Sequence, residues 1–181
     1  MYEIVERLGP IARELLASWM ELPRESFVPD RERFDPMTIV RILPVTSLIE
    51  REGDDEWRFR LVGTEIERRW GRRFTGRNCL EGLSPEAVAV MRRELKCIVE
   101  WPCGSWSQRR IELLSGRVTA IETLRLPLRA KCGVVSQILS CSGELGGNFL
   151  PAADPTREII RIVDQEYFDI GAGCPACGAI A

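Results

Sequence analysis

Apolar residues in the first part of the chain follow helical spacing and then strand spacing. Between positions 9 and 22 they recur every three or four residues: Ile11, Leu15, Trp19 and Leu22. This spacing predicts an amphipathic helix. In residues 57–62 apolar and charged side chains alternate, which predicts a strand with Trp57, Phe59 and Leu61 on one face. Residues 45–51 precede this strand across a Gly-Asp-Asp turn, so the two segments form a predicted β-hairpin.

The middle of the chain carries three helix-start signals. Asp35-Pro36 predicts a short helix over residues 36–43. Thr64-x-x-Glu67 has the spacing of a capping box, and the helix that it starts would end at Gly71. Ser84-Pro85 combines a capping hydroxyl with a first-turn proline. The helix after this signal has its apolar residues on one stripe: Val88, Met91, Leu95 and Ile98.

From residue 105 the apolar period changes to that of strands. Residues 105–114, 117–128 and 134–141 are alternating or β-branched and are separated by turns, which predicts three antiparallel strands. The predicted order is a helix, two strands, about three helices and three strands, an α+β arrangement. We divide the chain into an N-terminal helix and loop (1–34), a central domain (35–150) and a C-terminal extension (151–181).

Composition and charge narrow the function. The 181 residues are 45% hydrophobic and 29% charged, with a net charge of −2. This balance predicts no nucleic-acid partner and no attraction to an anionic membrane. No apolar run approaches the length of a membrane span, and the N-terminus lacks the apolar core of a signal peptide. We therefore expect a cytoplasmic protein.

The chain contains no histidine, which removes several chemistries. Serine–histidine catalysis, histidine-ligated haem and the usual histidine metal sites are excluded. No carboxylate pair, glycine-rich phosphate loop or nucleophile elbow appears either. The sequence therefore predicts a protein that is not an enzyme.

Short segments of the chain resemble the PAS domain. They are Arg58-Phe-Arg-Leu-Val-Gly-Thr64, Phe74-Thr-Gly-Arg77 and the strand corner Leu126-Pro-Leu-Arg129 with Gly133. The layout is similar to that of a family of single-domain PAS-fold proteins found mainly in alphaproteobacteria. The resemblance implies a five-stranded antiparallel sheet with helices across one face. It also implies sensing or regulation, through a small ligand, a homodimer or a signalling partner.

A PAS fold would leave a mostly apolar pocket between the sheet and the helices. The candidate lining residues are Trp57, Phe59, Leu61, Ile66, Trp70, Val88, Met91, Ile121 and Ile138. They would suit a small apolar ligand, and they would equally fill an ordinary core; both interpretations stay open. The N-terminal helix also has two possible roles, as a dimer contact through Trp19 or as a cap over its own sheet.

One segment resembles the photoactive site of light-oxygen-voltage (LOV) flavin domains. Gly76-Arg-Asn-Cys79 is similar to the motif around their reactive cysteine, but Leu80 replaces the arginine that follows it there. The positions of the flavin-binding amides fall at Leu83, Ile121 and near Ser142. Apolar side chains cannot replace these bonds. The cofactor is therefore unknown, and we expect no flavin.

Two further groups of residues have alternative interpretations. Cys174-x-x-Cys177 could hold zinc or act as a redox pair. The alternative function is therefore that of a thiol redox or zinc-binding protein. The odd number of cysteines, seven, and the lack of a signal peptide otherwise favour free thiols. A run of arginines could form a docking patch or a solvated helix face with local ion pairs. This run consists of Arg68, Arg69, Arg72, Arg73 and Arg77.

Overall fold

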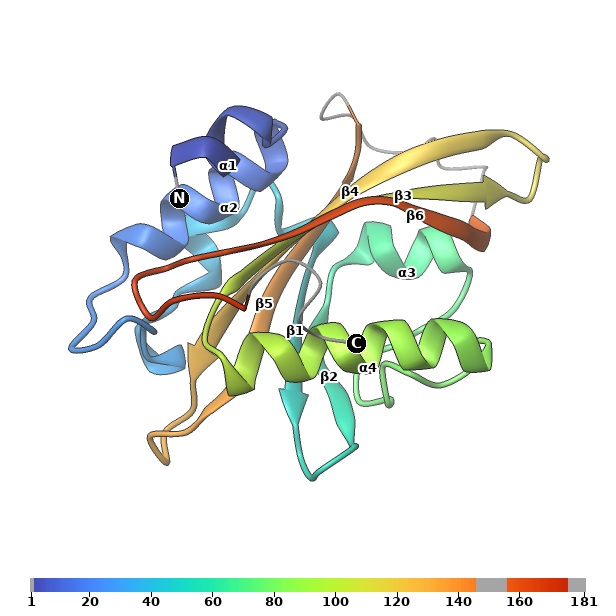
Figure 1. The fold of residues 1–181 in the computed structure, drawn as a ribbon. Helices are drawn as coiled ribbons and strands as arrows, with labels where there is room; N and C mark the ends of the chain where they lie inside the picture. Colours follow the sequence, from blue (N-terminus) through green and yellow to red (C-terminus); the bar gives the residue numbers. More distant parts are fainter. Residues whose placement is uncertain (1, 146–155, 176–181) are drawn as a thin grey trace.

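The centre of the protein is an antiparallel sheet of six strands (Figure 1). The computed structural model describes residues 2–145 and 156–175. The strands are β1 (Thr46–Arg51), β2 (Trp57–Val62), β3 (Gly104–Leu113), β4 (Val118–Arg129), β5 (Val135–Glu144) and β6 (Thr156–Phe168), in the spatial order β2-β1-β5-β4-β3-β6. Five of them are those that the sequence predicts. The sixth, β6, comes from the C-terminal extension and pairs along the whole of β3.

Helices cover both faces of the sheet (Figure 1). They are α1 (Tyr2–Arg7), α2 (Pro10–Glu21), α3 (Thr64–Trp70) and α4 (Pro85–Glu100). The first two pack on one face over an apolar core, and the last two cover the other face. Within the described residues no helix has the length and apolar character needed to cross a membrane.

Helix α2 is a cap over its own sheet. Leu15 and Trp19 are fully buried, and the Trp19 indole N–H donates to the Pro127 carbonyl at 2.9 Å. At the other end of the helix, the Gly9 N–H donates to the buried Glu122 carboxylate at 3.0 Å, which places a negative charge at the helix N-terminus. A dimer contact through the Trp19 stripe is therefore wrong, because that stripe faces the protein's own core.

The prediction for β2 is wrong at one residue. Leu48 pairs with Leu61 but Ile49 pairs with Phe59, so Arg60 is an extra residue in a β-bulge. The bulge reverses the direction of the side chains that follow it. Phe59 and Trp57 face α4, whereas Leu61 packs against the core on the side of α1 and α2.

The helix-start signals are partly correct. The Ser84 hydroxyl accepts from the Ala87 N–H at 3.3 Å and caps α4 as predicted. The N-cap of α3 is Gly63 rather than Thr64, and Glu67 instead accepts from the Phe74 N–H at 2.9 Å. Residues 36–43 form no α-helix: Pro36–Ile39 make a 3-10 turn, and a second 3-10 turn, Leu43–Val45, begins at the last of these residues.

Candidate functional site

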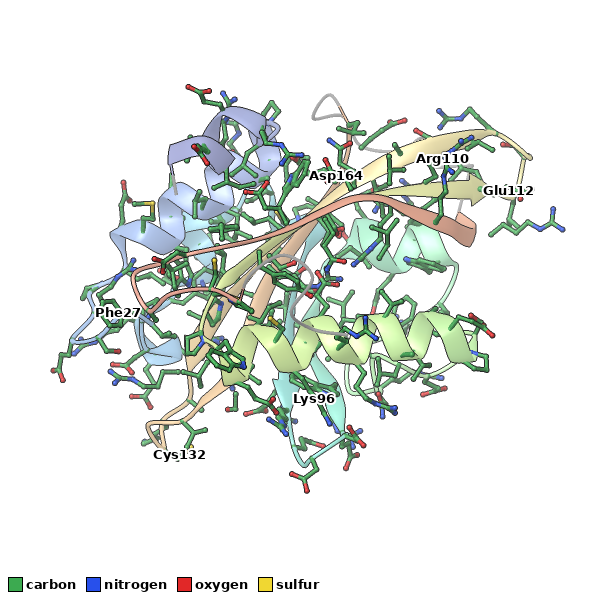
Figure 2. All side chains as sticks on the ribbon, in the orientation of Figure 1. Phe27, Lys96, Arg110, Glu112, Cys132 and Asp164 are labelled. Atoms are coloured by element: carbon green, nitrogen blue, oxygen red, sulfur yellow. The ribbon has the colours of Figure 1, made fainter. Side chains whose placement is uncertain are left out.

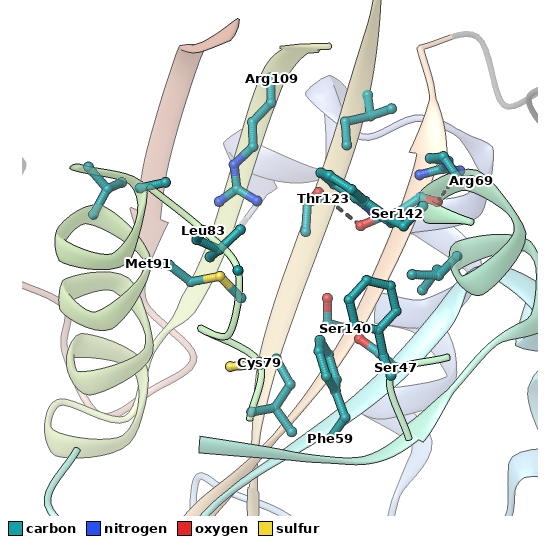
Figure 3. A pocket seen from close by; sticks show the side chains of 18 of the residues that line it. Ser47, Phe59, Arg69, Cys79, Leu83, Met91, Arg109, Thr123, Ser140 and Ser142 are labelled. Carbon is teal, nitrogen blue, oxygen red and sulfur yellow. Dashed lines mark hydrogen bonds between the residues drawn. The ribbon is translucent and has the colours of Figure 1, made fainter. Parts of the chain in front are cut away.

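A cavity of about 590 Å³ lies between the sheet and helices α3 and α4 (Figure 3). Strands β1, β3, β4 and β5 form its floor, and Arg157, Arg161 and Ile162 of β6 close one edge. The segment between α3 and α4 adds further lining residues, including Cys79 and Leu83. This volume is in the range of small-molecule sites.

The floor of the cavity is polar although it is part of the protein interior. Successive strands contribute hydroxyls and guanidiniums: Ser47, Arg109, Thr123, Arg125, Ser140 and Ser142. The opposite face of the same strands is apolar, with Leu48, Leu124, Leu126, Leu139 and Cys141 in the core under α2. Each strand therefore has an apolar side under α2 and a side rich in polar groups that faces the cavity, where Ile49 and Ile121 are the apolar exceptions on β1 and β4.

The walls of the cavity are mostly apolar and aromatic. Phe74 makes edge-to-face contacts with Phe59 at 5.6 Å and with Trp70 at 6.5 Å between ring centroids. Ile66 and Met91 complete this side. A molecule in the cavity would thus meet an aromatic cluster from β2, α3 and the segment after α3, and polar groups on the central strands.

A buried ion triad anchors α4 to the floor. Glu94 is fully buried and accepts bonds at 2.7 Å each from the Ser105 hydroxyl, Arg109 and Arg125. Burial alone would raise the pKa of the Glu94 carboxyl, but the two guanidiniums hold it below its usual value. Burial lowers the pKa of Arg109 to about 10, and the neighbouring Arg125 acts in the same direction. Because this pKa is still well above neutral pH, Arg109 remains charged there. One carboxylate therefore faces two cations.

Arg69 is a second buried cation, and it has no ion pair among the residues that the structure describes. Arg69 is 2% exposed, and among the described residues its hydrogen bond is a 3.3 Å contact in which a terminal nitrogen donates to the Ser142 carbonyl. Its Nε–H is buried without a partner. Burial lowers the pKa of Arg69 to about 10. The expectation of a solvated arginine face is thus wrong for this residue.

Figure 3 shows how these groups lie around the cavity. Arg69 and Arg109 point toward it from opposite sides, with Thr123 and Ser142 between them. The hydroxyls of Thr123 and Ser142 bond to each other at 3.0 Å. Within the described chain, the Arg125 Nε–H is buried without a hydrogen-bond partner, so the floor keeps unused bonding capacity.

Positive charge dominates the lining. Six arginines border the cavity, namely Arg69, Arg72, Arg109, Arg125, Arg157 and Arg161. The lining contains one carboxylate, Glu86. Two carboxylates that do not line the cavity partly balance this charge. Glu94 pairs with Arg109 and Arg125, and Glu112 pairs with Arg157.

The structure brings five of the nine predicted pocket residues to the cavity: Phe59, Ile66, Trp70, Met91 and Ile121. Trp57, Val88 and Ile138 instead pack in the core beside it, and Leu61 lies on the other face of the sheet. Whether any of the nine contacts a ligand stays a prediction.

Sequence analysis missed the polar floor. In β4 the order Thr123-Leu124-Arg125-Leu126 alternates polar and apolar residues, which is also the pattern of a strand with one face in water. The signal that was available is the unusual content of that polar face, where arginine and hydroxyl residues recur on neighbouring strands.

The positions expected to hold a flavin in the LOV manner do line the cavity. Cys79, Leu83, Ile121 and Ser142 all border it. Leu83 and Ile121 supply no hydrogen bond, and burial raises the pKa of the Cys79 thiol to about 12. These residues therefore do not fit a flavin that is held by side-chain amides and attacked by a cysteine thiolate, as in LOV domains.

The described part of the chain leaves the cysteine alternative a prediction. Cys174 is exposed, with a thiol pKa raised by burial and by Asp169, and Cys177 lies outside the described residues. The Sγ atoms of Cys97 and Cys103 are 3.9 Å apart in the interior. Cys132 stands at the exposed β4–β5 turn (Figure 2). Among the described residues no three Cys, Asp or Glu side chains are grouped as a metal site.

The sequence profile of the PAS domain matches residues 9–142, close to three quarters of the chain. The chain belongs to the PAS domain family. The predicted resemblance is therefore confirmed at the level of the family, and PAS domains are typically sensory or regulatory modules. The profile ends before β6, so this strand is an addition to the matched region.

Solved structures resemble the chain only at low identity and low TM-score. No curated protein matches the chain. An RNA-binding light-oxygen-voltage receptor is 17% identical over 70% of this chain, with a TM-score of 0.43, and the match spans 38% of that receptor. A fungal LOV domain photoreceptor is 19% identical over 72% of this chain and 88% of its own, with a TM-score of 0.39.

Proposed function

We propose that this protein is a PAS-type sensory module that binds a small molecule in the cavity between the sheet and helices α3 and α4. The observation that carries the proposal is the 590 Å³ cavity with a polar floor inside the fold. A core that served only for stability would fill this space with apolar side chains. The retained hydroxyls and guanidiniums support a binding role, because they can orient a ligand.

The same site supports a role without catalysis. No histidine exists to transfer protons near neutral pH, and burial raises the pKa of the cavity thiol Cys79 to about 12, away from a reactive thiolate. We propose that the output is transmitted by contact with a signalling protein or with a second copy of the chain in the cytoplasm. Helix α4 suits this role, because Glu94 connects it to the cavity floor while Val90 on the helix and Trp101 directly after it are exposed.

Native mass spectrometry of the freshly purified protein tests the proposal. We expect a stoichiometric small molecule, or a bound form that appears on adding cell extract, and its loss on acid denaturation. An absorption spectrum of the same sample should lack flavin bands. A protein that carries no small molecule even after incubation with cell extract would contradict the sensor assignment.

The alternative of a thiol or zinc protein stays a prediction, and the same sample tests it. Zinc analysis that finds one metal per chain or per dimer, lost on replacing Cys174 and Cys177 by serine, would favour it. A metal-free protein with an occupied cavity would favour the sensor.

A further inference from the structure

The cavity combines three features that together specify the charge of its ligand. Its lining has six arginines against one carboxylate. Its floor offers hydroxyls, and its opposite wall is aromatic. Cations with hydroxyls bind oxygen anions well, and aromatic walls bind an apolar body.

We propose that the ligand is an amphipathic organic anion, whose carboxylate or phosphate group binds Arg69 and whose apolar body lies against Phe59, Trp70 and Phe74. This inference rests on the proposed function and adds the chemical class of the ligand. It differs from the sequence-based expectation of an apolar ligand, because that expectation considered only the wall residues.

Arg69 is the residue that carries the assignment. Burying a guanidinium without a direct ion pair has a desolvation cost that van der Waals packing does not offset. Glu65 and Glu144 attract this cation without pairing with it directly, since Glu65 binds Arg68 at 2.9 Å and Glu144 binds Thr119 at 2.7 Å. The Arg69 Nε–H remains buried and unpartnered. An oxygen anion entering the cavity would supply the missing charge and acceptor at once.

The second group of cations supports the same ligand class. Glu94 shares its single charge between Arg109 and Arg125, and the Arg125 Nε–H is also buried without a partner. The floor between the two groups consists of Thr123 and Ser142 (Figure 3). An anion held there would be solvated by protein donors in place of water.

Calorimetric titration of the full chain with matched acid and neutral probes tests the inference. The pairs are octanoate with octanamide, phenylacetate with phenylacetamide, and octyl phosphate with octanol. At pH 7.5 we expect at least one acid to bind about tenfold or more tightly than its neutral partner, since bonds to charged groups are the stronger ones. The carboxylate and phosphate probes then distinguish the two head groups.

Variants assign the effect to Arg69. Arg69→Met should remove the preference for the acid, and Arg69→Lys should retain part of it. Arg110→Met is the matched control, since Arg110 is exposed on β3 and does not line the cavity (Figure 2). We expect this control to bind the acids as the wild type does.

Each contrary outcome has a separate meaning. Equal affinity for acid and neutral probes would overturn the inference about charge and leave the ligand-binding cavity standing. A preference that survives Arg69→Met would overturn the assignment to Arg69. No binding of any of the six probes would contradict the proposed function itself.

Discussion

Glu94→Gln is expected to destabilise the protein strongly, because it removes the charge at the centre of a buried ion triad. The carboxylate is fully buried and accepts three bonds of 2.7 Å, from Ser105, Arg109 and Arg125. Glutamine keeps the shape but presents an N–H₂ donor where one guanidinium also donates. Two buried cations then lose their counter-ion, and breaking such a group costs about 3–5 kcal/mol.

The expected loss of stability is large for a domain of this size. At about 2–4 °C per kcal/mol, the melting temperature should fall by about 6–20 °C. Glu100→Gln is the matched control on the same helix, since Glu100 pairs with Arg51 at 3.1 Å and is half exposed. An exposed pair of this kind contributes about 0–1 kcal/mol.

The dependence on pH gives a second readout. Burial alone would raise the pKa of Glu94, but Arg125 and Arg109 hold it below the ordinary value of 4.5. The folded state therefore binds its proton at lower pH than the unfolded state. The stabilisation is complete above the unfolded pKa and is lost as the pH falls through the folded one. The difference between wild type and Glu94→Gln should thus shrink below about pH 4.5.

Urea unfolding of the three proteins at pH 7 and pH 4, followed by far-ultraviolet circular dichroism, measures these differences. Equal midpoints for Glu94→Gln and Glu100→Gln at pH 7 would refute the reasoning. So would a difference that grows on acidification.

Three further substitutions test other parts of the structure. Arg69→Met should raise the free energy of unfolding of the ligand-free protein by about 1–3 kcal/mol, because at neutral pH the buried unpaired charge is fully present; thermal melts measure it. Trp19→Ala should cost about 3–5 kcal/mol without changing the oligomeric state, since the side chain is buried and bonded to Pro127; urea unfolding and sedimentation measure these. Gly104→Ala should lower the free energy of unfolding by about 1–3 kcal/mol, because the added Cβ would lie 2.1 Å from the Phe168 ring. The backbone amides of β6 should then exchange faster with solvent in a hydrogen-exchange experiment.

Each of the three has a control of the same chemical kind. Arg110→Met replaces an exposed arginine, and Trp101→Ala replaces a tryptophan that is 64% exposed. Gly53→Ala adds a methyl group with no neighbour nearer than 3.9 Å. Effects as large in the controls as in the test variants would contradict the roles assigned to Arg69, Trp19 and Gly104.

Much of the fold could be predicted because local signals and tertiary structure agree. The Ser84-Pro85 cap, the stripe of α4 and the alternation of β3, β4 and β5 each indicate one type of secondary structure. The bulge at Arg60 could not be predicted, since its neighbours alternate regularly and the extra residue is fixed by pairing with β1. The pairing of β6 could not be predicted from local patterns, because its partner β3 lies about fifty residues away in sequence.

The candidate site could be predicted only in part. Apolar wall residues such as Phe59 and Ile66 follow from periodicity. The polar floor does not, because a strand pattern separates two faces without telling which medium each one meets. Arg69 shows the same limit, since a charged residue on a short helix is usually exposed and here packs into the interior.

The most direct test of the central claim is a nitrogen-15 NMR titration of the protein with octanoate, monitoring the backbone amides and the arginine Nε–H signals. The account predicts that the Arg69 Nε–H signal and the amides of Thr123, Ser140 and Ser142 shift together and saturate. Binding that leaves these signals unchanged and shifts amides of α1 and α2 would place the ligand on the other side of the sheet and contradict the account.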